Sequence, residues 1–339
     1  MATRKITFRD AINEAMRLEM RRDPTVILMG EDVAGGATLS HLEGENKEAW
    51  GGVLGVSYGL RPEFGGERVR DTPISESAFI GAAVGAASTG LRPIAELMFV
   101  DFLGVCFDQI FNQGAKLRYM FGGKAQVPIV VRTTVGGGFR AAAQHSQSLY
   151  SIFVHIPGIK SVIPSTPYDA KGLLSSAIRD NDPVMFFENK VLYDMEGEVP
   201  EENYTIPLGV ADVKREGKDL TIVTLGRMVH LSLEAAGKLA GDGVDVEVVD
   251  LRSLSPLDED TILTSVKKTH RLIVVDEANP RCNMATDIVA LIAGQAFDYL
   301  DAPPRMITAP HTPVPFSPTL EDAYLPSVDT IVSTAQSLI

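Results

Sequence analysis

The chain has 339 residues, enough for about two domains, and 45% of them are hydrophobic, which excludes an intrinsically disordered protein. Its 44 acidic residues outnumber 31 basic ones, and the net charge of −13 excludes the basic surface that nonspecific binding to nucleic acids or anionic membranes requires. The excess of acidic residues is explained by solubility, or by docking to a basic partner domain.

Cysteine content and apolar run lengths predict a cytoplasmic protein. Cys106 and Cys282 lie far apart and belong to no Cys-x-x-Cys pair, so we expect neither a disulfide framework nor a zinc site, as in a reducing compartment. The N-terminal residues lack an apolar core segment, so we expect no secretory signal. The apolar stretch Ile74–Ala87 is shorter than the roughly 20 residues that a membrane-spanning helix needs.

The first half of the chain alternates between strand and helix patterns. Thr7 is placed to cap a helix whose apolar residues recur at helical spacing from Phe8 to Met16. Short apolar runs typical of buried strands follow, namely Val26–Met29, Ile94–Phe99, Ile129–Val131, Ser161–Ile163 and Val184–Phe187. Helical sequence separates several of them, for example Tyr168–Ile178. This alternation predicts a mostly parallel sheet with helices on both faces.

A polar, proline-containing break around Asn189–Pro207 predicts a linker at residues 191–206, between a domain of residues 1–190 and a domain of residues 207–339. The alternation then resumes, with strands expected at Leu220–Thr224, Val246–Val249 and Arg271–Val275, and helices at Met228–Leu239, Leu257–Thr269, Asn283–Phe297 and Ser327–Leu338. The proline-rich Ala309–Pro315 cannot be a helix or a central strand. The predicted fold is α/β, with two doubly wound, mostly parallel-sheet domains.

The most informative segment is Asp71–Glu76, which leads into a helix of small apolar residues from Phe79 to Ala87. It places the Glu76 carboxylate against a closely packed apolar wall, where loss of solvent disfavours the charged form. A carboxyl group kept near neutrality can exchange a proton with a ligand at pH 7. A thiamine diphosphate enzyme requires this property of the glutamate beside its aminopyrimidine ring.

Three further residues are candidates for function. Glu31 follows a predicted strand and is either a solvated loop acid or a second acid near Glu76, which would raise the pKa of one of the two. His145 follows the glycine run Gly136–Gly138; an isolated histidine is more often structural, but a loop position favours function, and histidine suits proton transfer near neutral pH. Phe102 either packs in the core or stacks on a flat heterocycle.

Two motifs in the chain lack the context that their function requires. Gly55–Gly59 matches the nucleophile elbow of hydrolases, but a glycine-broken run precedes it and a poor helix follows, so a serine hydrolase using Ser57 remains a remote alternative. Gly241-Asp242-Gly243 matches the start of the metal–diphosphate motif of thiamine enzymes, but the chain contains no Asn-Asn pair to complete it. We therefore interpret this triplet as a turn and expect no diphosphate site in this chain.

Over essentially its full length the chain resembles the beta subunits of the first, decarboxylating component of 2-oxo acid dehydrogenase complexes. The shared segments are Gly30–Val33, Asp71–Glu76, Phe107–Ile110, Gln144–Gln147, His155–Gly158, Asp250–Arg252 and Val275–Glu277. Within this family, the chain is most similar to the acetoin dehydrogenase branch and next to the pyruvate dehydrogenase branch. The segments that point to acetoin dehydrogenase are Ala49–Val56, Glu96–Phe102, Arg118–Ala125 and Gly197–Glu202.

The resemblance implies a heterotetramer of two alpha and two beta chains, with thiamine diphosphate at the alpha–beta interface. The alpha chain would hold the diphosphate and magnesium, and the beta chain would hold the aminopyrimidine through Glu76, Ile74 and Phe102. The resemblance also places Met98 among the cofactor-binding positions. Some relatives carry glutamine there, so we do not expect a polar contact from Met98. The resemblance makes Glu76, His145 and Glu31 catalytic: His145 in reductive acylation of lipoyl groups, and Glu31 in proton relay between paired sites.

The resemblance also implies a structural potassium ion, held mainly by backbone oxygens at Ile129, Ala177, Ile178, Asp180 and Asp182. The expected reaction is cleavage of acetoin and transfer of the two-carbon acyl unit to lipoyl groups of the dihydrolipoyl acyltransferase core. Oxidative decarboxylation of pyruvate is the alternative. A non-catalytic scaffold subunit that docks to the acyltransferase core is a remote third possibility.

Overall fold

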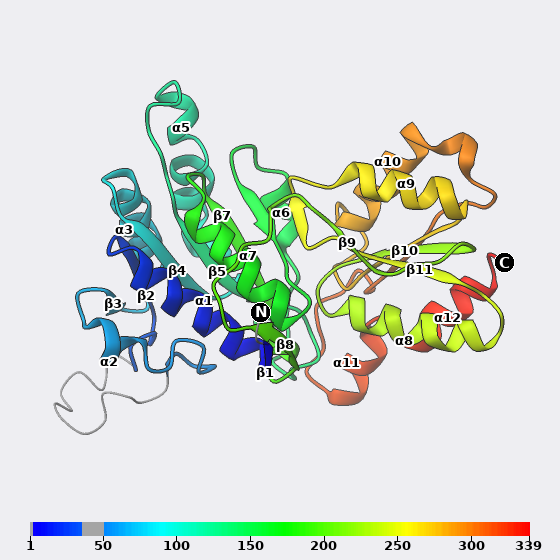
Figure 1. The fold of residues 1–339 in the computed structure, drawn as a ribbon, viewed down its shortest axis with the longest axis horizontal. Coiled ribbons are helices and arrows are strands. Elements are labelled where there is room, and N and C mark those ends of the chain that lie inside the picture. The colour runs from blue at the N-terminus through cyan, green and yellow to red at the C-terminus, as the bar shows by residue number, and fades with distance from the viewer. Residues whose placement is uncertain (1–2, 36–50) are drawn as a thin grey trace.

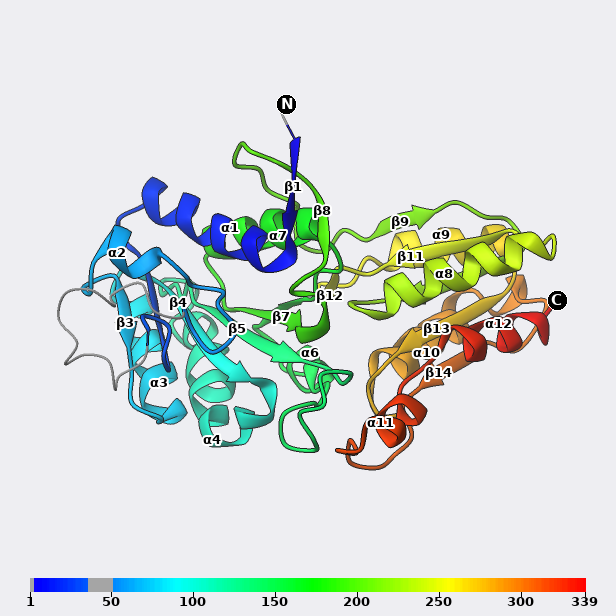
Figure 2. The same cartoon turned by 90° about the horizontal axis from the view of Figure 1, so that it is seen from below.

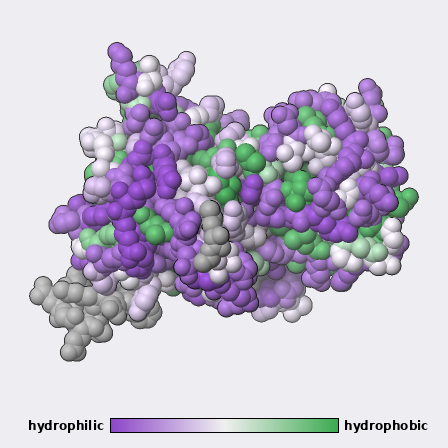
Figure 3. Space-filling model, in the orientation of Figure 1, coloured by the Kyte–Doolittle hydropathy of each residue, from purple (hydrophilic) through white to green (hydrophobic). Residues whose placement is uncertain are grey.

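The computed structural model describes residues 3–35 and 51–339, and consists of two lobes side by side, each built around its own sheet (Figure 1). Ala49 and Trp50, part of one segment that carries the family resemblance, lie outside the described residues. Among the described helices, none has the length and apolar character needed to cross a membrane. The face seen in Figure 3 is mostly hydrophilic, with apolar patches of limited size.

The first lobe contains a seven-stranded sheet in the order β12-β6-β7-β5-β4-β2-β3, in which every neighbouring pair except β12–β6 is parallel. The strands are β2 (Val26–Gly30), β3 (Val69–Asp71), β4 (Arg92–Phe99), β5 (Val130–Val135), β6 (Lys160–Val162), β7 (Val184–Asn189) and β12 (Ser253–Ser255). Its helical segments are α1 (Phe8–Arg22), α2 (Leu60–Phe64), α3 (Glu76–Ser88), η2 (Val100–Phe102), α4 (Leu103–Asp108), η3 (Gln109–Gly114), α5 (Leu117–Met120), α6 (Tyr150–Val154), α7 (Pro167–Arg179) and η4 (Lys190–Leu192).

Helices cover both faces of this sheet, as Figure 2 shows, with α1 and α7 on one side and α3, α4 and α6 on the other. Alternate residues of β2 serve the two faces: Val26 and Leu28 pack in the cluster with α1 and α7, whereas Ile27 and Met29 pack in the cluster with α3 and α4. Thr7 caps α1 as predicted, since its hydroxyl accepts the Asp10 N–H at 3.1 Å. The continuous apolar strands follow from burial on both faces.

The second lobe contains a five-stranded sheet in the order β14-β13-β10-β11-β9, parallel except for β9. The strands are β9 (Asp212–Arg215), β10 (Leu220–Thr224), β11 (Val246–Asp250), β13 (Leu272–Asp276) and β14 (Arg305–Thr308). The helical segments are α8 (Met228–Gly241), α9 (Glu259–Thr269), α10 (Met284–Gln295), η5 (Phe297–Tyr299), α11 (Pro318–Tyr324) and α12 (Val328–Gln336). Helices α9 and α10 lie on one face and α8 and α12 on the other (Figure 1), which confirms the predicted fold class.

The segment expected to be a linker contains regular structure that the sequence did not reveal. Strand β8 (Glu196–Pro200) pairs antiparallel with β1 (Thr3–Thr7), and the Phe8 N–H donates to the Met195 carbonyl at 2.8 Å. The polar ribbon carries no apolar run, because it packs at the surface. Residues 191–206 are therefore not a simple connection: part of the segment is tied to the N-terminus.

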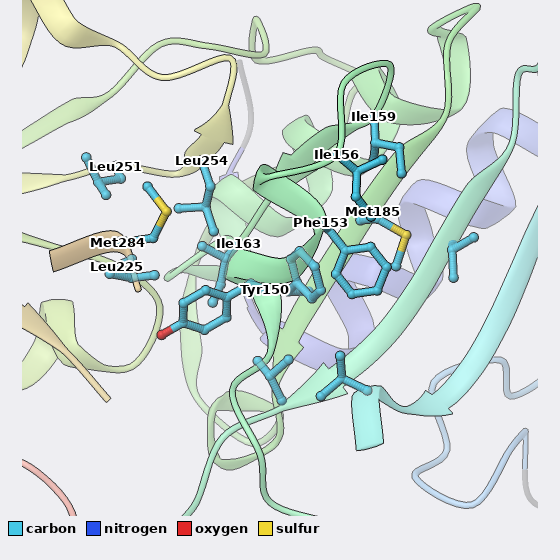
Figure 4. Packing of buried hydrophobic residues seen from close by; sticks show 14 of the residues in the cluster. Tyr150, Phe153, Ile156, Ile159, Ile163, Met185, Leu225, Leu251, Leu254 and Met284 are labelled. Carbon is cyan, nitrogen blue, oxygen red and sulfur yellow. The ribbon is translucent and has the colours of Figure 1, made fainter. Parts of the chain in front are cut away.

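The two lobes also share a hydrophobic core. Strand β12, from the second half of the sequence, joins the edge of the first sheet beside β6. One buried cluster includes Tyr150 and Ile163 of the first lobe together with Leu225, Leu254 and Met284 of the second (Figure 4). Because this shared apolar surface is removed from water, the two lobes are held together by the same force that forms each lobe's interior.

Candidate active site

The predicted catalytic and cofactor-binding residues lie beyond the carboxyl ends of four adjacent strands. Glu31 follows β2, Glu76 follows β3, Phe102 follows β4, and His145 lies on the loop that follows β5. These strands are neighbours in the order β5-β4-β2-β3, and they run parallel. Parallel strands end at the same edge of the sheet, which is where open α/β folds bind ligands. The sheet order thus gathers residues that are up to 114 positions apart in the sequence.

Several acidic residues lie on the β2–β3 side of this edge. Glu76 is the first residue of α3 and is only 9% exposed, and among the described residues none makes a hydrogen bond with its carboxylate. Burial, the neighbouring Asp32 and then Glu76 raise the pKa of Glu31. Burial and then the negative charge of Glu76 raise the pKa of the Cys106 thiol to about 12. The Glu76 carboxylate is therefore close enough to act electrostatically on both groups.

An aromatic group occupies the β4–β5 side. The His145 ring lies edge-on to Phe99, with 4.8 Å between ring centroids, and edge-on to Phe102 at 5.5 Å. Phe99 and Phe102 are themselves edge-to-face at 5.6 Å. The backbone N–H and side-chain amide of Gln147 both donate to Asp101 Oδ1, at 3.2 and 2.8 Å. These contacts hold the His145 segment against the residues that follow β4, with ring geometry favoured for aromatic pairs.

The two other predicted cofactor contacts differ in exposure. Ile74, two residues before Glu76 in the sequence, is a large apolar side chain that is 77% exposed. Met98 is partly buried near the end of β4, and its carbonyl accepts the Thr134 hydroxyl at 2.7 Å. The edge of the sheet therefore offers a buried carboxyl, an exposed isoleucine, a thioether and aromatic rings. Such a set suits a flat heterocycle whose faces contact apolar side chains and whose edge offers a polar ring atom to the carboxyl group.

The sequence interpretation missed Lys190, a 2% exposed lysine in η4 at the carboxyl end of β7. Its ammonium group donates to the Gly136 carbonyl at 2.8 Å and lies 5.7 Å from the centroid of the Phe99 ring. Burial lowers the pKa of Lys190 to about 8, against the opposing influence of Glu277, Asp101 and other acids. The signal was available: Glu188-Asn189-Lys190 ends an apolar strand at the edge where the other candidates lie.

Replacing Lys190 by methionine is expected to remove a pH-dependent component of stability. Between pH 8 and 10.5 the unfolded chain binds a proton at Lys190 that the folded chain does not, so stability rises with pH across this window. Across this window the free energy of unfolding of the native chain should rise by about 3 kcal/mol more than that of Lys190→Met. Urea unfolding of both proteins at pH 8 and 10 measures most of it, with exposed Lys238→Met as the control; parallel profiles for Lys190→Met and the native chain would contradict the effect.

The positions predicted to hold potassium surround the end of α7 and the starts of β5 and β7; they are Ile129, Ala177, Ile178, Asp180 and Asp182. Their oxygens already have hydrogen-bond partners. Arg92 Nη1 donates to the carbonyls of Ile178 and Asp180 at 2.9 and 2.8 Å, and Lys160 pairs with the Asp180 carboxylate at 2.6 Å. Each carbonyl retains a second lone pair, so the backbone set still fits a weakly bound monovalent cation. Residues 3–35 and 51–339 contain no cluster of three His, Cys, Asp or Glu residues suited to a metal ion.

The structure assigns local roles to the two motifs that lacked context. Ser57 is buried, and its hydroxyl donates to the Val33 carbonyl at 2.6 Å, which stabilises a loop and offers no exposed nucleophile. Asp242 caps the C-terminus of α8, and Gly243 follows with a φ of 83°, so Gly241-Asp242-Gly243 is a helix-ending turn.

The fold and the site together define a transketolase-type α/β protein whose ligand site lies at the carboxyl edge of its first sheet. The transketolase pyrimidine-binding domain model matches residues 4–195, and the transketolase C-terminal domain model matches residues 209–331. A solved chain described as "Split gene transketolase, inactive beta4 tetramer" superposes with a TM-score of 0.75 at 21% identity and 98% coverage of both chains, which shows the shared fold.

Full-length relatives show the family. The acetoin:2,6-dichlorophenolindophenol oxidoreductase subunit beta of Bacillus subtilis is 67% identical over 99% of this chain and 98% of its own length. The protein of the same name from Cupriavidus necator is 63% identical over 98% of this chain and 97% of its own length. The pyruvate dehydrogenase E1 component subunit beta of B. subtilis is 47% identical over 99% of both chains. The chain belongs to the family of beta subunits of thiamine-diphosphate-dependent acetoin and 2-oxo acid dehydrogenases.

Proposed function

We propose that the chain, together with an alpha subunit, cleaves acetoin and passes the two-carbon acyl unit to lipoyl groups of a dihydrolipoyl acyltransferase core. The observation that carries the proposal is the Glu76 carboxyl group: it is almost buried, close to Glu31, and without a hydrogen-bond partner among the described residues. Because no group of the described residues competes for it, this carboxyl is available to a ligand.

The residues at this edge fit the aminopyrimidine of thiamine diphosphate. Glu76 would exchange a hydrogen-bonded proton with a ring nitrogen, while Ile74, Met98 and Phe102 would contact the ring's faces and edges. When bound, the cofactor supplies the nucleophilic carbon and stabilises the carbanion. The surrounding apolar residues lower the local dielectric, which strengthens the hydrogen bond from Glu76. Glu31, whose raised pKa favours the protonated form, is suited to relay protons to and from Glu76.

A second chain is needed to complete the cofactor site. This chain has no Asn-Asn pair, and its one Gly-Asp-Gly triplet forms the helix-ending turn after α8. We therefore assign the diphosphate and its magnesium ion to the alpha chain of an alpha₂beta₂ heterotetramer. The relatives' names, which describe beta subunits, support a separate alpha partner. Free Cys106 and Cys282 fit a reducing, cytoplasmic setting.

Turnover of acetoin against pyruvate by the complex reconstituted with its alpha subunit tests the substrate. We expect acetoin to have at least a tenfold higher kcat/KM, because two relatives above 60% identity carry acetoin in their names. An equal or higher value with pyruvate would replace the acetoin proposal with the pyruvate alternative. Activity without added alpha subunit would contradict the division of the cofactor site between two chains.

Potassium binding at residues 129 and 177–182 is a separate proposal, supported by the carbonyls of Ile178 and Asp180, which both face Arg92 Nη1. The ion would add to the hydrogen bonds from Arg92 rather than replace them. A thermal midpoint that rises with KCl but not with equal NaCl is the expected result. Equal midpoints in the two salts would count against a specific site.

A further inference from the structure

The glycine run before His145 is held by buried charged side chains from outside its own loop. Lys190 Nζ donates to the Gly136 carbonyl at 2.8 Å, the Gly137 N–H donates to Glu277 Oε2 at 3.3 Å, and the Gly138 N–H donates to Glu321 Oε1 at 2.7 Å. Three consecutive residues thus each place a backbone group on a different charged side chain. Hydrogen bonds to charged groups are about twice as strong as those between neutral groups.

This close approach explains why glycine occupies these positions. Gly136 and Gly138 have φ values of 87° and 90°, which residues other than glycine rarely adopt. A Cβ atom on Gly136 would lie 2.6 Å from Glu277 Oε1, and one on Gly138 would clash with Arg227 Nη1. The backbone therefore passes directly against the polar side chains of the second lobe.

Glu321 makes the largest set of these contacts. It lies in α11 and is completely buried, and its second carboxylate oxygen accepts Arg140 Nη1 at 2.8 Å. In Figure 2, α11 lies on the part of the second lobe that approaches loops of the first. One buried carboxylate of the second lobe thus binds both a backbone N–H and a guanidinium of the β5 loop. Arg140 also pairs with Asp322, the next residue of α11, at 2.6 Å.

The loop is strained where Glu321 holds it. Arg140 and Ala142 have φ values of 61° and 60°, so left-handed conformations recur at every second residue from Gly136 to Ala142. For a residue other than glycine such a conformation is unfavourable, and it persists only when surrounding contacts enforce it. The contacts of the second lobe supply that enforcement.

The same loop carries His145. Its base is closed by the Gly136 N–H, which donates to the Gln147 carbonyl at 3.1 Å. The His145 ring then packs against Phe99 and Phe102. Ala142 is three residues before His145, so a change of backbone conformation at residues 138–142 moves the attachment point of the imidazole.

We propose that Glu321 is a positioning residue, which fixes the Gly136–Gln147 loop from the second lobe and so places His145 at the site in the first lobe. The second lobe thereby contributes to acyl transfer without touching the substrate. The effect on transfer rests on the proposed role of His145, but the conformation of the loop can be measured independently of that role.

Hydrogen–deuterium exchange of loop peptides, measured on the complex with the alpha subunit, tests the contact directly. In Glu321→Ala we expect amides of residues 136–147 to exchange at least tenfold faster. Acyl transfer to lipoyl groups should fall at least tenfold. Reduction of the dye 2,6-dichlorophenolindophenol, which reports the first step, cleavage of acetoin, should stay within about threefold of the native rate. Glu321→Gln retains an oxygen for the Gly138 N–H, so its exchange and transfer should be closer to native than those of Glu321→Ala.

Asp322→Ala is the matched control. Asp322 is on the same helix and also pairs with Arg140, but its side chain is 66% exposed and, within the described residues, it makes no hydrogen bond to the glycine run. It should leave exchange and transfer native-like; an effect as large as that of Glu321→Ala would overturn the specific role of Glu321. If Glu321→Ala fails to fold, Gly138→Ala displaces the same loop without altering α11 and should give the same pattern.

The outcomes separate this proposal from the role of His145. Native-like exchange in a folded Glu321→Ala protein overturns the positioning contact. If His145→Ala impairs transfer, faster exchange with full retention of transfer in Glu321→Ala overturns the positioning role. If His145→Ala leaves transfer intact while Glu321→Ala accelerates exchange, the proposed function of His145 fails and the structural contact stands.

Discussion

Glu76→Gln is expected to abolish cofactor-dependent turnover, with a loss of about 10²- to 10⁴-fold, the range for removal of a general acid–base group. Glutamine has the same shape and can still form a hydrogen bond in this nearly buried position, but it cannot give or take a proton there. Assembly with the alpha subunit should be unchanged, because the substitution removes no apolar contact. Initial rates in the reconstituted complex, with size-exclusion chromatography for assembly, measure both effects.

A matched control separates proton exchange from general loss of negative charge. Glu67→Gln removes a carboxylate nine residues earlier, but that side chain is 97% exposed and its one ion pair within residues 3–35 and 51–339 is with exposed Arg70. Glu67→Gln should retain native activity. Near-native turnover in Glu76→Gln would refute the proton-exchange role. Loss of assembly in Glu76→Gln would indicate a structural role at the subunit interface.

His145→Ala is expected to impair acyl transfer to lipoyl groups by about 10²-fold while leaving the first step within a few fold, because proton transfer by histidine contributes at least that much. The ring is held edge-on between Phe99 and Phe102, so its removal eliminates one positioned imidazole without disturbing the β2–β3 side, where Glu76 lies. Dye reduction reports the first step, and acylation of a free lipoyl domain reports the second.

Exposed His311 in the proline-rich loop provides the control for this second experiment. His311→Ala should leave both steps unchanged. Equal losses in dye reduction and lipoyl acylation for His145→Ala would contradict a role confined to transfer, and would place the histidine in the chemistry that both steps share.

Local sequence patterns were sufficient for most elements. Strand β10 spans the predicted Leu220–Thr224, and α1 begins after the predicted Thr7 cap, because burial on both faces and helix capping each leave a signature within a few residues. Strand β12 left no such signature: it has three residues and pairs with a strand more than 90 positions earlier in the chain. The antiparallel ribbon formed by β1 and β8 was missed because its residues are polar and partly exposed.

The candidate site shows the same division. Residue types and family motifs pointed to Glu76, Glu31, Phe102 and His145 individually. The sheet order brought them to one edge, and this order depends on non-local pairing. The position of Lys190 at a strand end could have marked it as a candidate, but its contact with the Gly136 carbonyl depends on the fold. Glu321 could not be assigned from the sequence, because its role follows from its burial against the Gly138 N–H.

Periodicity and residue type are local properties, so the order of residues was enough to predict most of the buried strands and helices and to show which acidic and imidazole groups the chain can offer for chemistry. The folded chain was needed to show that both lobes share a core, that four strand ends form one site, and that the second lobe holds the loop of His145. These features depend on contacts between residues far apart in the chain, and their energies arise only when folding removes both surfaces from water.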